Sequence, residues 1–158
     1  MKTLALKELD GVLAEWPFYM ERAIELAASV FNATPNPRVG CVIVKEGVVI
    51  GEGWHSAAGE KHAEIVALEN AGSLVKNSTA FVSLEPCAHQ GRTPPCTEAL
   101  IAAGVDRVVI ASVDPDERVS GRGIEALEEA NIEVYQLLDF DQQARSINPG
   151  FFKRQELG

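Results

Sequence analysis

One histidine and two cysteines stand out in this chain because together they could hold a metal ion. His62 is followed two residues later by Glu64, and Cys87 and Cys96 come further along the sequence. One imidazole and two thiolates are three protein ligands for zinc, and a three-ligand zinc site keeps its fourth tetrahedral position open. A carboxylate such as Glu64 can move protons at that position. The four residues therefore predict a hydrolytic zinc site.

The spacing of His62 and Glu64 places a condition on the local structure. Residues two apart on a regular helix point roughly 200° away from each other. The two side chains can share one site only if that site lies off the start of the helix that carries them. Cys87 and Cys96 flank a loop that leads into another predicted helix, and thiolates are stabilised at helix starts. We therefore expect two helix N-termini to face each other across the metal.

Other interpretations of the histidines and cysteines have to be weighed. A structural zinc site would need a fourth protein ligand, for which His55 and His89 are the candidates. The third cysteine, Cys41, lies inside the apolar run of residues 39–44, so we expect a buried core thiol. Three cysteines do not suggest a disulfide framework, and they favour a reducing compartment, the cytoplasm.

The hydrophobic pattern predicts an α/β protein. A helix begins near Pro17, with Phe18 on its apolar face, and a β-hairpin follows over residues 39–44 and 48–51. Helices over residues 59–71, 97–103, 124–130 and 140–147 alternate with strands over residues 79–84, 105–113 and 132–138. This alternation predicts parallel pairing, and the hairpin predicts an antiparallel edge. We expect a three-layer α/β/α sandwich around a mixed five-stranded sheet.

Composition favours a globular protein that acts on a small molecule. The 158 residues are 46% hydrophobic and 23% charged, which is enough for one well-formed core. The formal net charge of −9 opposes binding to nucleic acid. No apolar run approaches the ~18 residues of a membrane span, and charges at Lys7, Glu8 and Asp10 argue against a signal peptide. We therefore expect a cytoplasmic protein without nucleic-acid or membrane partners.

Several segments of the chain resemble the pyrimidine deaminases of riboflavin biosynthesis, the diaminohydroxyphosphoribosylaminopyrimidine deaminases. The most specific is residues 84–96, with eight residues between its cysteines instead of the two in most zinc deaminases. The others are residues 35–44, 51–55, 59–64, 114–115, 121–123 and 148–151. The resemblance covers about residues 18–153. It implies a cytidine-deaminase-like fold. It also implies hydrolytic removal of the 2-amino group from 2,5-diamino-6-ribosylamino-4(3H)-pyrimidinone 5′-phosphate, with release of ammonia.

The resemblance further implies roles for individual residues. His62, Cys87 and Cys96 take the zinc-ligand positions, and Glu64 takes the position of the proton carrier. The positions that family members use around the substrate correspond here to Asn36, His55, His89, Arg92, Asp114 and, with a changed residue type, Asp116.

The changed residue, Asp116, affects which substrate the sequence predicts. Residues 114–117 read Asp-Pro-Asp-Glu, where the family usually has Asp-Pro-Asn-Pro with the Asn close to the ribose phosphate. Two like charges ~4 Å apart repel by about 4 kcal/mol at an effective dielectric constant of ~20. Asp116 must then point away, contact a sugar hydroxyl, or indicate another pyrimidine, purine or pterin-like substrate.

Domain organisation is a second departure from the family. Bifunctional members continue into a C-terminal reductase domain, for which residues 1–158 leave no room. We expect residues 1–15 to be an N-terminal extension, residues 16–153 the deaminase domain and residues 154–158 a tail. A separate reductase would then act on the product. Deaminases of this fold commonly assemble, so the resemblance also implies a homodimer or homotetramer.

Two alternative functions have to be compared with deamination of the phosphorylated aminopyrimidine. A non-catalytic, zinc-stabilised partner protein would use the same three ligands but would not need Glu64. A transfer-RNA adenosine deaminase is disfavoured by the acidic charge and by the eight-residue spacing between the cysteines.

Overall fold

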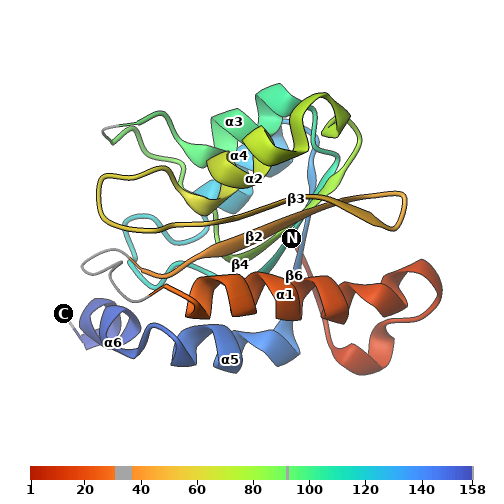
Figure 1. Ribbon diagram of the computed structural model, residues 1–158. Coiled ribbons are helices and arrows are strands. Elements are labelled where there is room, and N and C mark those ends of the chain that lie inside the picture. The colour runs from red at the N-terminus through yellow and green to blue at the C-terminus, as the bar shows by residue number, and fades with distance from the viewer. Residues whose placement is uncertain (31–36, 92, 158) are drawn as a thin grey trace.

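A six-stranded mixed sheet forms the centre of the computed structural model, which describes residues 1–30, 37–91 and 93–157 (Figure 1). Its strands are β1 (Lys2–Leu4), β2 (Gly40–Lys45), β3 (Val48–Trp54), β4 (Thr79–Leu84), β5 (Arg107–Ser112) and β6 (Glu133–Leu137). They lie in the order β1-β6-β5-β4-β2-β3. The first four in this order are mutually parallel, and β2 is antiparallel to both β4 and β3.

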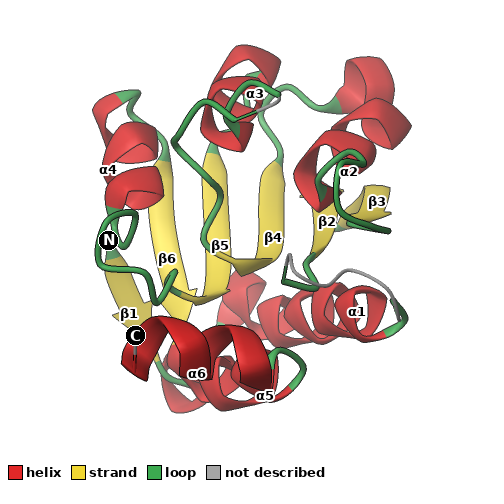
Figure 2. Cartoon of the chain, turned by 90° about the vertical axis from the view of Figure 1, so that its left-hand side faces the viewer, coloured by secondary structure: helices red, strands yellow, loops and turns green. Residues whose placement is uncertain are grey.

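Helices cover both faces of this sheet, as the α/β/α prediction requires. They are α1 (Trp16–Ala28), α2 (Ala63–Ala71), α3 (Cys96–Ala103), α4 (Arg122–Glu129), α5 (Asp141–Ser146) and α6 (Pro149–Leu157), with short 3₁₀ turns at Leu6–Glu8, Gly11–Glu15, Gly72–Leu74 and Leu138–Phe140. Helices α2, α3 and α4 lie on one side of the sheet, and α1, α5 and α6 lie on the other (Figures 1 and 2). No helix in the described part of the chain is both long and apolar enough to cross a membrane.

Successive side chains along each strand point to opposite faces of the sheet, so they contribute to two separate hydrophobic cores, one on each face. On β2, Cys41 and Ile43 pack toward α2, whereas Val42 and Val44 pack toward α1. The same alternation continues on β4 and β5, so these central strands are buried on both faces. Cys41 is fully buried, which confirms that it is a core thiol.

Several predicted elements differ from the structure. The sheet has six strands instead of five because Lys2–Leu4 pairs in parallel with β6. That strand is only three residues long and largely exposed, so it carries no hydrophobic periodicity to reveal it. Phe18 was expected on the buried face of α1 but is 77% exposed. Helix α6 was not predicted, and α2 begins at Ala63 instead of residue 59.

The strand register brings several chain segments to one end of the sheet. Leu84 of β4 lies opposite Ser112 of β5, and Gly40 of β2 lies opposite Trp54 of β3. Since β2 runs against β4, its first residue lies beside the end of β4, where Gly40 donates a backbone hydrogen bond to Ser83 Oγ (3.1 Å). In α/β proteins, ligands bind outside the carboxyl ends of the parallel strands. The predicted site residues follow these ends.

Candidate metal centre and active site

The start of α2 directs the side chains of His62 and Glu64 toward the same cavity. His62 is the N-cap residue, with an extended backbone (φ −70°, ψ 158°), and the helix begins at Ala63. Glu64 is therefore the second helical residue, where the first turn has not yet carried the side chains to opposite faces. The side chains of both residues line the same cavity. The predicted condition, a site off the helix start, is confirmed.

Two glycines of β3 let α2 lie directly on the strand. A Cβ atom built on Gly51 would be 2.3 Å from the Ala67 carbonyl oxygen, and one on Gly53 would be 2.4 Å from the Ala63 carbonyl oxygen. Real Cβ atoms do not approach oxygen this closely, so any side chain at either position would push the helix away. The backbone contact therefore determines where the first turn of α2, with His62 and Glu64, is held.

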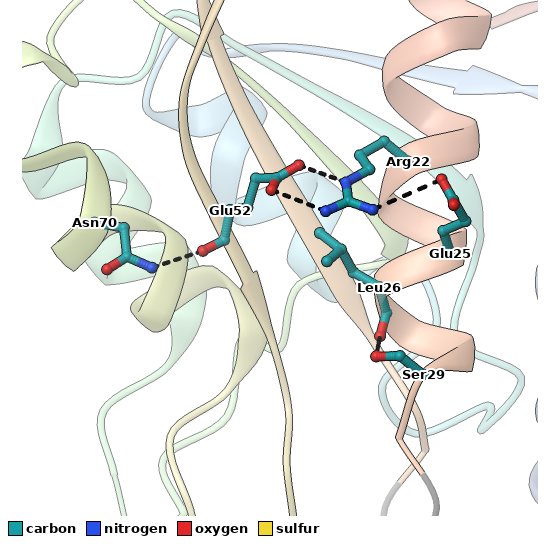
Figure 3. A network of polar contacts seen from close by, with 6 residues as sticks. All are labelled: Arg22, Glu25, Leu26, Ser29, Glu52 and Asn70. Atoms are coloured by element: carbon teal, nitrogen blue, oxygen red, sulfur yellow. Dashed lines mark hydrogen bonds and ion pairs between the residues drawn. The ribbon is translucent and has the colours of Figure 1, made fainter.

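The opposite face of β3 is tied to α1 by a polar network (Figure 3). Arg22 of α1 donates to both carboxylate oxygens of Glu52, at 2.7 and 3.2 Å. Asn70 of α2 donates to the Glu52 carbonyl oxygen at 2.8 Å. The edge strand is thus linked to a helix on each side.

The loop after β4 folds back on itself so that the two cysteines meet. Cys96 is the first residue of α3, and its backbone N–H donates to Cys87 Sγ (3.3 Å). The next amide, that of Thr97, donates to the Cys87 carbonyl oxygen (3.2 Å). These bonds use the unpaired N–H groups at the helix start. The second helix N-terminus therefore faces the first, as predicted.

The three candidate ligands form one compact cluster. His62 Nδ1 lies 3.3 Å from Cys96 Sγ and 3.8 Å from Cys87 Sγ, and all three donor atoms lie within 4.8 Å of one another. Tetrahedral zinc with bonds of about 2.3 Å to sulfur and about 2.1 Å to nitrogen separates two such donors by about 3.6 Å. The donor set and its spacing therefore fit zinc.

The arrangement does not support a closed, four-ligand site. Among the described residues, the cluster of metal-binding groups includes neither His55 nor His89. His55 lies beside the cluster, with its ring 5.2 Å from that of His62, but its Nδ1 faces the Lys61 carbonyl oxygen at 3.1 Å. Because a carbonyl oxygen can only accept a hydrogen bond, His55 Nδ1 carries a proton. His89 is exposed on the loop and lines the cavity.

Burial and neighbouring charge adjust the acidity of these groups. The pKa of Glu64 is raised to about 7, first because the carboxyl is buried and second because the Cys87 thiolate lies near it. The pKa of Cys87 is well below its usual value, chiefly because the Cys96 side chain donates a hydrogen bond to its sulfur, and that of Cys96 is raised. A divalent cation among these ligands would favour the ionised forms of all three groups.

A cavity of about 540 Å³ opens beside the cluster. Of the residues predicted to surround a substrate, His55, His89, Asp114 and Asp116 line it together with Glu64. Asn36 and Arg92, also predicted, lie outside the described residues. Sequence reasoning missed other lining residues, namely Pro37, Val39, Leu84, Glu85, Arg118, Val119 and Phe151.

Glu85 is the most informative of the missed residues because it lines the cavity and holds the backbone that follows β5. Its side chain is 5% exposed, and its carboxylate accepts four backbone hydrogen bonds. The donors are the N–H groups of Asp114 (3.1 Å), Gly121 (3.1 Å), Gly123 (2.9 Å) and Ile124 (3.2 Å). We call residues 113–121, which connect β5 to α4, the rim loop. A carboxylate placed directly after a buried strand was the signal that could have identified Glu85.

The family assignment follows from comparison with known proteins. Residues 15–112 match the family model described as the cytidine and deoxycytidylate deaminase zinc-binding region. The chain belongs to this deaminase family. The deaminase is 51% identical over 142 residues to the diaminohydroxyphosphoribosylamino-pyrimidine deaminase of Buchnera aphidicola subsp. Acyrthosiphon pisum, covering 89% of this chain and 96% of that protein. The predicted resemblance is therefore confirmed.

Longer relatives carry the same domain. The deaminase is 53% identical over 142 residues to the riboflavin biosynthesis protein RibD of Escherichia coli, covering 89% of this chain and 38% of that protein. The solved structure of Acinetobacter baumannii RibD, form 2, matches with a TM-score of 0.88 and 47% identity, over 92% of this chain and 41% of that one. The chain thus spans less than half the length of these two relatives.

Proposed function

We propose that this deaminase removes the 2-amino group of 2,5-diamino-6-ribosylamino-4(3H)-pyrimidinone 5′-phosphate by hydrolysis and releases ammonia. The observation that carries the proposal is the three-donor cluster with Glu64 beside it, in a chain that matches a relative of this activity over 96% of the relative's length. A cavity of about 540 Å³ is of the size that encloses a small-molecule ligand.

In this proposal, His62, Cys87 and Cys96 hold zinc. When bound, zinc supplies a Lewis acid that makes water more nucleophilic. Glu64 takes a proton from the attacking water and gives it to a ring nitrogen of the substrate. It then takes the proton of the hydroxyl group newly bound to the substrate carbon and gives it to the leaving amine, so that ammonia leaves as the carbonyl group forms. Without a metal, burial and the Cys87 thiolate raise the pKa of Glu64 to about 7, and a bound cation would favour the ionised carboxylate, which is the form that accepts the proton from water. Burial of Glu64 keeps bulk water from competing for that proton.

The other cavity residues are assigned to substrate binding. His55, His89 and Asp114 line the cavity and contribute polar groups to it. Asn36 and Arg92 keep the binding roles expected from the resemblance. Asp116 stays in this group, but its charge is balanced within the protein by Arg118 (2.6 Å), which removes the main argument for a different substrate.

The proposal is tested by measuring ammonia release from the purified chain after its zinc content has been quantified. We expect turnover of the phosphorylated diaminopyrimidine and none of cytidine, deoxycytidylate or guanine. Zinc-loaded protein that does not turn over the diaminopyrimidine would remove this substrate assignment. Turnover of one of the other compounds would instead establish the alternative substrate class.

The remaining expectations belong to the same proposal. Residues 16–153 act as the deaminase domain, and residues 1–15 extend it. The expected tail, residues 154–158, begins within helix α6, which continues to Leu157. The protein works in the cytoplasm as a homodimer or homotetramer, and a separate reductase acts on its product. Size-exclusion chromatography with light scattering tests the assembly state.

A further inference from the structure

The charges that line the cavity are unevenly distributed. Four carboxylates, those of Glu64, Glu85, Asp114 and Asp116, belong to its lining. Among the described lining residues, Arg118 is the one arginine or lysine. The chain as a whole carries a net charge of −9, so an anionic substrate group gains no long-range attraction from the protein. It needs a local cation at the cavity.

Arg118 is held at the rim by a short series of hydrogen bonds within the rim loop. Asp114 Oδ1 accepts the Asp116 backbone N–H (2.9 Å), and Asp116 Oδ1 accepts the Arg118 backbone N–H (2.9 Å). Side chains of aspartate stabilise turns in this way. Since Glu85 accepts the N–H of Asp114 (3.1 Å), the series begins at a buried carboxylate. The position of the Arg118 backbone is thus linked to the interior of the protein.

The side chain of Arg118 is also oriented. Its Nε lies 3.0 Å from Asp116 Oδ1, and its Nη2 lies 2.6 Å from Asp116 Oδ2, which is a bidentate pair. The pKa of Asp116 is lowered to about 2, first by the hydrogen bond from the Arg118 side chain, so the carboxylate stays ionised at neutral pH. Asp116 therefore does not present an uncompensated charge to a ligand.

This pairing leaves part of the guanidinium available. Arginine has five N–H donors in a planar fork, and Asp116 occupies one edge of it. The Arg118 side chain is 85% exposed, so its other edge is open to a ligand at the cavity mouth. A phosphate bound there would touch the guanidinium while the Asp116 carboxylate lies behind it. Because Coulomb energy falls with distance, the attraction at contact exceeds the repulsion.

We propose that Arg118, oriented by Asp116, is a specificity-determining residue that binds the phosphate of the substrate. The inference rests on the proposed function, because it assumes that a phosphorylated aminopyrimidine enters this cavity. It reverses the expectation from charge repulsion alone. Asp116 then assists binding through Arg118, and replacing it by asparagine weakens phosphate binding.

The test compares Arg118→Gln with the unchanged chain on the phosphorylated substrate and on its dephosphorylated form. Losing a charge-assisted hydrogen bond to phosphate should raise KM for the phosphorylated substrate about tenfold. KM for the dephosphorylated form and kcat for both should stay close to the values of the unchanged chain. Arg122→Gln is the matched control, because Arg122 is an exposed arginine four residues away that does not line the cavity.

Two further variants separate a binding role from a structural one. Asp116→Asn should raise KM for the phosphorylated substrate by a smaller factor, and Asp116→Asn with Arg118→Gln should resemble Arg118→Gln alone. An Arg118→Gln enzyme with equal effects on both substrates, or an Asp116→Asn enzyme with a lower KM, would overturn the inference. Inorganic phosphate provides an independent probe, since its inhibition constant should rise in Arg118→Gln.

The two proposals fail in different ways. If the unchanged, zinc-loaded chain turned over no diaminopyrimidine, the proposed function would be lost. Calorimetric binding of inorganic phosphate, compared between the unchanged chain and Arg118→Gln, would still decide the role of Arg118. If the unchanged chain were active and phosphate binding did not depend on Arg118, only the further inference would be lost.

Discussion

The two ends of the cavity are held in place by different interactions. At the metal end, the starts of α2 and α3 carry His62, Glu64 and Cys96, and α2 is seated by backbone packing against Gly51 and Gly53. At the other end, the rim loop depends on carboxylates that accept backbone N–H groups. The metal end is mainly buried, whereas the rim loop reaches solvent.

This difference indicates that the metal end and the rim loop have separate roles. Helix starts packed on a sheet hold donor atoms within the narrow distances that a metal requires. A loop held by polar side chains can change its outward residues without disturbing those donors. We therefore expect substitutions at the metal end to reduce kcat or zinc content, and substitutions in the rim loop to act mainly on KM. Four predictions test this comparison, in order of decreasing effect.

The largest effect is expected for Glu64→Gln. An amide cannot accept and return the proton, so kcat should fall by at least ~10³-fold while the three metal ligands remain. Zinc content by atomic emission and ammonia release are the two measurements. Glu60→Gln, at an exposed position before α2, is the control and should keep full activity. A Glu64→Gln enzyme of nearly normal rate would rule out this residue as the proton carrier.

Glu85→Gln should show whether the rim loop and the metal end can be perturbed independently. An amide group at this position would place N–H groups against two of the four backbone N–H donors, at a cost of about 3 kcal/mol in the free energy of unfolding. The rim loop should shift, so KM should rise while zinc content is retained. Urea denaturation, steady-state kinetics and amide exchange of residues 114–124 measure these effects.

Glu98→Gln provides the control for that substitution, since Glu98 is an exposed glutamate on α3. If Glu85→Gln lost zinc as readily as it lost substrate affinity, the two ends would not be independent.

Gly53→Ala tests the backbone packing of α2. The added methyl group would meet the Ala63 carbonyl oxygen at 2.4 Å and the Ala67 nitrogen at 2.6 Å. Overpacking of this kind should lower the free energy of unfolding by about 2 kcal/mol and reduce zinc affinity, because α2 carries His62. Gly91→Ala, where the new Cβ meets nothing within 4 Å, is the matched control for stability. Normal zinc affinity in Gly53→Ala would show that His62 is placed by other contacts.

Arg22→Ala should have the smallest effect. The Arg22–Glu52 pair in Figure 3 is partly exposed, with side-chain exposures of 45% and 32%. Exposed pairs contribute about 0–1 kcal/mol and are screened by salt. Zinc content and KM should not change, and the small loss of stability should disappear in concentrated salt. A marked loss of zinc would mean that the network on the α1 side of β3 also positions α2.

That His62, Cys87 and Cys96 could form one cluster was predictable from the sequence alone. Metal ligation requires particular residue types, so His62, Cys87 and Cys96 can be recognised as candidate ligands in the sequence. The two-residue spacing between His62 and Glu64 already requires that their shared site lie at a helix start. The apolar run that contains Cys41 predicts its burial, and α3 ends as expected at Gly104, in the left-handed conformation (φ 81°). In each case the property depends on residue type or on interactions between residues close together in the sequence.

Tertiary structure alone decided the other features. Glu85 meets the N–H groups of residues 29 to 39 positions away, and β1 pairs with β6 across the whole chain. The exposure of Phe18 depends on which face of α1 the sheet covers. A backbone N–H carries no residue-specific signal, so no pattern in the sequence reveals which carboxylate it will meet. Local rules therefore predict the candidate metal ligands, whereas long-range hydrogen bonds determine the part of the cavity wall that Glu85 forms.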